Sequence, residues 1–135
     1  MLKYRYIVII GVIVALIGVS AVNKGYCEGL WKITAYCSCE KCCGKSDGIM
    51  ASGKKVYIGA IACNVLPIGT SIVIPDTKDI KLNTFTAFTY KVEDRGSHKL
   101  FDKQKHIDIY LPDHEWAKRF GVQYSRVYKI ELKQI

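Results

Sequence analysis

Two aspartates in the second half of the sequence have the residue type and the setting for acid–base chemistry. Asp94 lies in the motif Val92–Gly96, at the end of a long predicted strand, and Asp108 lies inside the alternating run His106–Tyr110. If these runs are neighbouring strands, both carboxylates lie near the same end of a sheet, within a few ångströms of each other. Close like charges and the loss of water at a barrel edge raise the pKa of one carboxylic acid. An acid that stays protonated near neutral pH can protonate a glycosidic oxygen.

Both the aspartates and the histidines also have explanations that involve no chemistry. Asp94 can form a turn with Gly96 and pair with Arg95. A metal site would need His98, His106 and His114, with Asp108 as a fourth ligand, but no known zinc spacing fits them. We therefore expect solvated histidines, no metal ligand and no cofactor.

The sequence contains six cysteines, and four of these cysteines fall within residues 37–43. Their chemical state is open between three possibilities. An even number of cysteines in a small exported domain favours disulfides. Cys39 and Cys42 also have the spacing of a zinc knuckle, and free thiols are the third possibility. Adjacent cysteines do not easily pair with each other, so their partners should lie elsewhere. We expect structural disulfides that tie the loop before residues 50–53 to the rest of the domain, drawn from Cys37, Cys39, Cys42, Cys43 and Cys63.

The N-terminus directs export. Lys3 and Arg5 precede the apolar run Ile7–Val22, which is the pattern of a signal peptide. The run is long for a signal peptide, so an uncleaved membrane anchor is the alternative. We expect residues 1–22 to be this leader or anchor, residues 23–29 a linker, and residues 30–135 one domain outside the cytoplasm, either secreted or associated with the cell wall.

The charge balance favours an anionic partner. The chain has 135 residues and a formal net charge of +8. A basic exported domain suits a wall polymer or lipid headgroups. Nucleic acid is not expected as a partner, because the lysines are scattered and no nucleic-acid motif occurs.

The domain is predicted to be mostly β. Strands are expected at 30–36, 56–61, 71–74, 84–93, 106–111 and 126–132, where apolar and polar residues alternate or β-branched and aromatic residues gather. One short helix is expected between the last two strands, opened by Pro112 and Asp113 and stopped by Gly121. Six short strands and one helix indicate a small barrel or sandwich.

Several motifs in order resemble the bacterial three-aspartate (3D) domain family. They span about residues 30–132 and lie at 33–45, 47–53, 59–64, 66–70, 92–96 and 106–110. The resemblance implies a small six-stranded double-psi β-barrel with one short helix, similar to the catalytic barrel of lytic transglycosylase A. Two of the three aspartates of the family correspond to Asp94 and Asp108. Asn64 stands at the position of the first, and Met50 stands where threonine is usual.

The resemblance also implies a function. The family's chemistry is non-hydrolytic cleavage of the β-1,4 bond between N-acetylmuramic acid and N-acetylglucosamine in peptidoglycan, which leaves 1,6-anhydro ends. Asp108 would then be the acid/base, and Asp94 would raise its pKa. The residues expected to bind glycan strands are Asn64, Thr34, Tyr36 and Gly96. A hydrolytic glycosidase, a non-catalytic wall-binding module and a cysteine-rich metal or redox protein are the alternatives, and the domain is expected to be a monomer.

Overall fold

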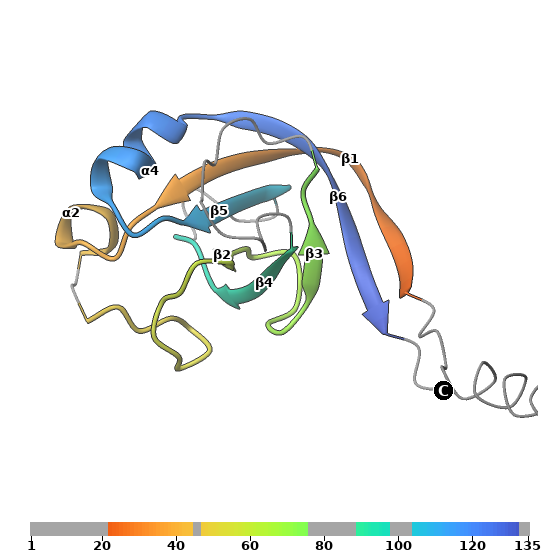
Figure 1. The fold of residues 1–135 in the computed structure, drawn as a ribbon, viewed down its shortest axis with the longest axis horizontal. Helices are drawn as coiled ribbons and strands as arrows, with labels where there is room; N and C mark the ends of the chain where they lie inside the picture. Colours follow the sequence, from red (N-terminus) through yellow and green to blue (C-terminus); the bar gives the residue numbers. More distant parts are fainter. Residues whose placement is uncertain (1–21, 45–46, 76–88, 98–103, 133–135) are drawn as a thin grey trace, which may run out of the picture.

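A closed barrel of six strands forms the described part of the protein (Figure 1). The computed structural model describes residues 22–44, 47–75, 89–97 and 104–132. The order around the barrel is β1-β5-β2-β4-β3-β6, with β1 beside β5 and β2 beside β4 in parallel and the other pairs antiparallel. The predicted fold class, a small mostly β barrel of six strands, is confirmed. The strands are β1 Val22–Tyr36, β2 Ala60–Ala62, β3 Ser71–Val73, β4 Thr89–Asp94, β5 His106–Tyr110 and β6 Gln123–Leu132.

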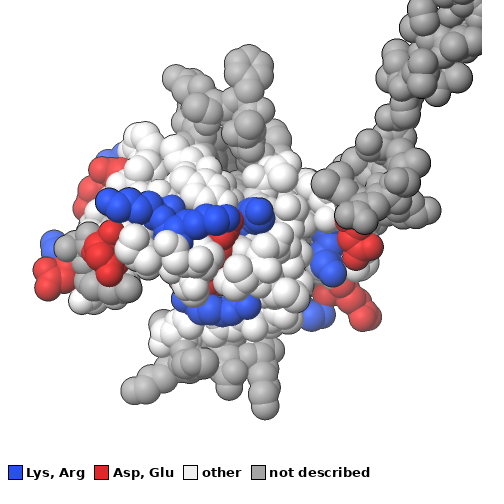
Figure 2. Space-filling model, turned by 90° about the horizontal axis from the view of Figure 1, so that it is seen from below, with Lys and Arg blue, Asp and Glu red and all other residues white. Residues whose placement is uncertain are grey.

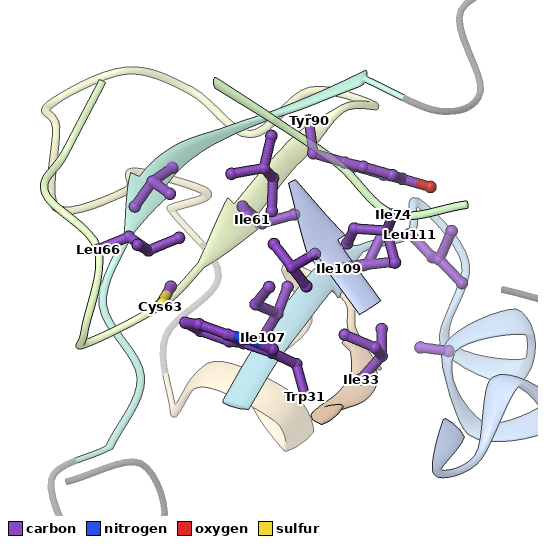
Figure 3. Packing of buried hydrophobic residues seen from close by; sticks show 14 of the residues in the cluster. Trp31, Ile33, Ile61, Cys63, Leu66, Ile74, Tyr90, Ile107, Ile109 and Leu111 are labelled. Atoms are coloured by element: carbon purple, nitrogen blue, oxygen red, sulfur yellow. The ribbon is translucent and has the colours of Figure 1, made fainter. Parts of the chain in front are cut away.

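Alternation along the strands builds the core. In β5, Ile107 and Ile109 point into the barrel and are almost fully buried, and Ile33 of β1 and Ile61 of β2 meet them there (Figure 3). Because side chains alternate between the two faces of a strand, Asp108 must point to the outside of the barrel. The core therefore decides which β5 side chains are available for chemistry.

Two short helices lie together at one end of the barrel (Figure 1). The predicted helix is α4, His114–Phe120, which is capped by the Asp113 carboxylate and followed by Gly121 with a positive φ. The other helix, α2 (Glu40–Cys43), is one turn inside the cysteine-rich stretch and was not expected from the sequence. Its four residues, Glu-Lys-Cys-Cys, show no apolar periodicity that would indicate an amphipathic helix, and none of them is buried.

The strand boundaries correct the sequence prediction in two places. Residues 23–29 are not a linker, because they belong to β1 and pair with β6, and the two strands extend together beyond the barrel (Figure 1). β2 begins at Ala60, later than the predicted 56–61. The predicted strand at 84–93 is found from Thr89 onward, and its first five residues lie outside the described residues.

The expected leader, residues 1–22, lies outside the described residues except for its last position. Within the described part of the chain, no helix has both the length and the apolar character needed to cross a membrane.

Candidate active site

From the sequence we considered the two aspartates on neighbouring strands, but in the structure a third strand lies between them. β2 lies between β4 and β5, and Ala62 faces Asp94 on one side and Asp108 on the other. Two strand spacings of ~4.8 Å separate the backbones of the aspartates by about 10 Å. The small alanine side chain between them leaves space above the sheet, so both carboxylates reach the same cavity.

A β-bulge gives Asp94 its direction. Ile61 pairs with Val92, but the next residue, Ala62, pairs with Asp94, so Glu93 is an extra residue in β4. Val92 points into the core. Strict alternation would send Asp94 there too, whereas the extra residue turns it to the outer face beside Ala62.

The site is a cavity of about 600 Å³ on the outer face of β1, β5, β2 and β4. Tyr36 and Ala62 of the lining belong to a small apolar cluster with Tyr110, in which the two tyrosine rings meet edge to face with their centroids 5.7 Å apart. The loop after α2 forms the opposite wall. The cavity is lined by Tyr36, Ser38, Cys42, Cys43, Asp47, Gly48, Ile49, Met50, Ala51, Val56, Ala62, Asp94, Arg95, Gly96, Ser97 and Asp108.

Asp94 is held in place by three hydrogen bonds. Its Oδ1 accepts from the backbone N–H groups of Ala51 (2.8 Å) and Arg95 (2.9 Å), and its Oδ2 accepts from the Tyr36 hydroxyl (3.3 Å). The Arg95 guanidinium does not pair with this carboxylate; it donates to the carbonyls of Cys63 and Leu66. Burial, followed by the nearby carboxylates of Asp94 and Asp108, raises the pKa of Tyr36 well above its ordinary value, so Tyr36 stays a neutral donor.

Asp108 is half-buried and has few partners. Its Oδ1 accepts a 2.9 Å hydrogen bond from the Thr34 hydroxyl, whose oxygen lies 2.7 Å from Nε2 of His106. While Asp108 is ionised, the threonine hydroxyl donates its single proton to the carboxylate, and the contact with His106 is then a hydrogen bond only in the tautomer or charge state with a proton on Nε2. Burial raises the pKa of Asp108 to about 6, the Thr34 hydrogen bond opposes that rise, and the Asp94 charge adds to it. Among the described residues, neither aspartate forms an ion pair.

Glu93 fixes the loop that closes the cavity, and sequence reasoning did not identify it. Its side chain is buried, with Oε1 at 2.8 Å from the Lys54 ammonium and 3.0 Å from the Tyr57 hydroxyl, and its carbonyl accepts from the Ser52 amide. The Lys54 hydrogen bond holds the pKa of Glu93 below its usual value. In the sequence, Glu93 is visible only as a second acidic residue next to Asp94. The bulge directs Glu93 away from the cavity that Asp94 lines.

The four residues expected to bind substrate separate into two groups. Tyr36 and Gly96 line the cavity, whereas Thr34 lies behind Asp108 as its hydrogen-bond donor, and Asn64 is not in the cavity wall. Asn64 forms two hydrogen bonds with the backbone of Gly96: its Nδ2 donates to the carbonyl (3.2 Å), and its Oδ1 accepts from the amide (2.9 Å). Asn64 therefore holds the turn after Asp94 and does not line the cavity.

The structure does not show the expected disulfides. All six cysteines are free. Cys63 is buried in the core and Cys27 packs against that core, and neither belongs to the group of cysteines around His114. Cys37, Cys39 and Cys42 gather instead around His114, which the sequence interpretation had placed among solvated histidines. Cys43 turns away and donates its thiol to the Cys37 carbonyl at 3.1 Å.

Comparison with known proteins gives a structural likeness and no family. No family model matches the sequence, and no curated protein matches it. Two solved structures of the lytic transglycosylase MltA from E. coli are similar. One, of a single-site variant in its apo-2 form, has a TM-score of 0.49 and 20% sequence identity over 64% of this chain. The other has a TM-score of 0.44 and 19% identity over 63% of this chain. The match spans 28% of the length of each MltA chain, and nothing about chemistry follows from a likeness of this size.

Asn64→Asp tests the role that the structure gives to Asn64. The sequence resemblance alone predicts that restoring an aspartate keeps or raises activity. The structure predicts a destabilised variant instead. A carboxylate cannot donate to the Gly96 carbonyl, so the substitution would place two hydrogen-bond acceptors opposite each other. We expect a loss of stability of about 1–3 kcal/mol, measured by urea denaturation at neutral pH. A variant as stable as the wild type would show that the amide donor is not needed.

Proposed function

We propose that this chain cleaves peptidoglycan glycan strands as a lytic transglycosylase, with Asp108 as the single acid/base. One observation carries the proposal: a half-buried carboxyl with a pKa of about 6 opens into a 600 Å³ cavity beside a second carboxylate. Such a carboxyl is protonated in a large fraction of molecules at mildly acidic pH, which a general acid requires. The likeness of the motifs around Asp94 and Asp108 to the three-aspartate family supports the choice of substrate.

The proposed reaction uses one residue twice. Asp108 gives its proton to the oxygen of the β-1,4 bond as the bond from that oxygen to the muramoyl C1 breaks. The resulting carboxylate then takes the proton from the muramoyl C6 hydroxyl, and the C6 oxygen bonds to C1. The products are a 1,6-anhydro end and a new N-acetylglucosamine hydroxyl, and Asp108 has recovered its proton. Positioning of the substrate's own hydroxyl replaces a water nucleophile.

The contacts of Asp94 favour this route over hydrolysis. A hydrolytic glycosidase needs a second carboxylate that activates water or attacks the sugar. Asp94 already accepts hydrogen bonds from two backbone amides and from Tyr36, which hold it against the cavity wall. Its part is electrostatic, because its charge adds to the raised pKa of Asp108. The Tyr36 ring and the Gly96 backbone remain as the cavity's contacts for sugar.

The surface charge agrees with an anionic cell-wall environment. The chain carries a net charge of +8, and lysine and arginine side chains form a row across the face shown in Figure 2. Basic side chains in a row attract wall polymers or lipid headgroups by a field that salt screens. We include in the proposal that the domain acts as a monomer outside the cytoplasm and needs no cofactor for the reaction.

Export can be tested directly. We expect a reporter that works only outside the cytoplasm to be active when it is fused after Ile135, because Lys3, Arg5 and the run Ile7–Val22 form an export signal. Reporter activity confined to the cytoplasm, with no membrane association, would contradict export. The size of the cell-associated protein then distinguishes a cleaved leader from an anchor.

Asp108→Asn should abolish release of anhydro-muropeptides from purified peptidoglycan. Asparagine has nearly the same shape and still accepts from Thr34, but it cannot exchange a proton, so a loss of ~10²–10⁴-fold is expected with little change in thermal stability. Mass analysis of the released fragments is the measurement.

Asp47→Asn is the matched control, since Asp47 lines the same cavity and the amide oxygen of asparagine can still accept the hydrogen bond from the Ile49 amide. This variant should keep activity. Wild-type turnover in Asp108→Asn would remove the acid/base assignment. Reducing ends in place of anhydro ends would establish hydrolysis. Binding to sacculi without any released fragment would replace the enzyme with a wall-binding module.

The pH dependence of the rate separates the roles of Asp94 and Thr34. The reaction begins from protonated Asp108, so the rate should fall as pH rises through about 6. Asp94→Asn removes a charge that raises the pKa of Asp108, so the fall should move to lower pH. Thr34→Val removes a hydrogen bond that lowers this pKa, so the fall should move to higher pH. Initial rates from about pH 4 to pH 8 check both directions. Unchanged profiles in both variants would show that another group controls the rate.

A further inference from the structure

Three cysteines and one histidine form a cluster with the composition of a structural metal site. We propose that Cys37, Cys39, Cys42 and His114 bind one Zn²⁺ ion. Their ligand atoms all lie within 4.8 Å of one another. Cys37 comes directly after β1, Cys39 is the N-cap of α2, Cys42 lies within α2, and His114 is the first residue of α4, so three separate elements meet here.

The distances fit a tetrahedral site after small side-chain movements. Around zinc, bond lengths of ~2.3 Å to sulfur and ~2.0 Å to nitrogen place sulfur and nitrogen about 3.5 Å apart and two sulfurs about 3.8 Å apart. Nδ1 of His114 lies 3.5, 3.3 and 3.5 Å from the sulfurs of Cys37, Cys39 and Cys42. The sulfur of Cys37 lies 2.8 Å from that of Cys39 and 3.2 Å from that of Cys42. Those two pairs must separate by up to about 1 Å, which small rotations of the cysteine side chains can supply.

The backbone holds three of the ligands before any metal binds. The Cys39 carbonyl accepts from the amides of Cys42 and Cys43, which closes the turn that brings Cys39 and Cys42 together. His114 is placed by the Asp113 cap, whose carboxylate accepts from Trp116. A site organised in this way loses little conformational freedom when it binds an ion.

The set of ligands favours zinc in a structural role. Three soft thiolates and one imidazole are a Cys₃His site, and a site with four protein ligands has no open position for a substrate or water. Cys43 adjoins Cys42 but uses its thiol on the Cys37 carbonyl, so it stands outside the set. The ion would tie the end of β1 to the start of α4. It would also fix the segment that carries Cys42 and Cys43, which line the cavity. This inference does not depend on the reaction proposed for the cavity.

The purified full chain, kept in a mild detergent and under reducing conditions, tests the site. We expect stoichiometric zinc to remain after dialysis. Replacement of zinc by Co²⁺ should give the strong visible bands of tetrahedral cobalt together with sulfur-to-cobalt charge transfer. Cys39→Ser and His114→Ala should each lose or shift these bands. Cys43→Ser is the matched control in the same loop, and it should keep both the bands and the stoichiometry.

A second measurement needs no variant. Removal of zinc from the wild-type chain by a chelator should lower its Tm by several degrees, and added Zn²⁺ should restore it, because binding to the folded state stabilises that state. The proposal is overturned if the reduced wild-type chain retains neither zinc nor cobalt. It is also overturned if Cys43→Ser removes the cobalt bands while Cys39→Ser keeps them, or if the exported protein holds a disulfide among Cys37, Cys39 and Cys42. Anhydro-muropeptide release is scored separately, so failure of the zinc site and failure of the enzyme are distinguishable.

Discussion

Ala62 pairs with two strands at once, and the geometry of the cavity depends on this double pairing. In β2 it is opposite Asp108 on one side and Asp94 on the other. The pairing to β4 is possible only because Glu93 is an extra residue in that strand. Without the bulge, Asp94 would follow Val92 into an apolar core, where an unpaired carboxylate costs several kcal/mol. One inserted residue therefore places both acids in one cavity.

The same bulge supplies the side chain that fixes the loop forming one wall of the cavity. Glu93 is buried, and its charge is compensated by Lys54 and Tyr57. A buried ion pair is weak evidence of added stability, because desolvation of both charges offsets their attraction. Its clear effect is on position: the loop that carries Lys54 also delivers the Ala51 amide to Asp94. The orientation of Asp94 and the wall of the cavity are thus set by consecutive residues of one strand.

The features that depend on local alternation and helix-end residues could be predicted from the sequence. The features that depend on which strands are neighbours, or on contacts between distant residues, could not. Asp108 was placed on the polar face of its strand correctly, because Ile107 and Ile109 leave it no other direction. The helix after it was also predicted, since Asp113 and Gly121 bound it. The position of β2 between the two acids was not predictable, because β2 has only three residues and its pairing is settled by the closed barrel. The approach of His114 to the cysteines was missed as well, since the fourth ligand follows the others by more than seventy positions and no spacing motif joins them.

Register between β1 and β5 links the cysteine cluster to the acid. These strands are parallel, so no hairpin turn fixes how they align. A slip of one residue would turn Thr34 away from Asp108 and send an aliphatic side chain to the cavity. Beyond the ends of the pair, the Leu111 amide donates to the Tyr36 carbonyl, and the cysteines after β1 meet the histidine after β5. Any bond across that junction opposes the slip. A cross-link in the cluster would therefore help to keep the Thr34–Asp108 contact in register without touching either residue.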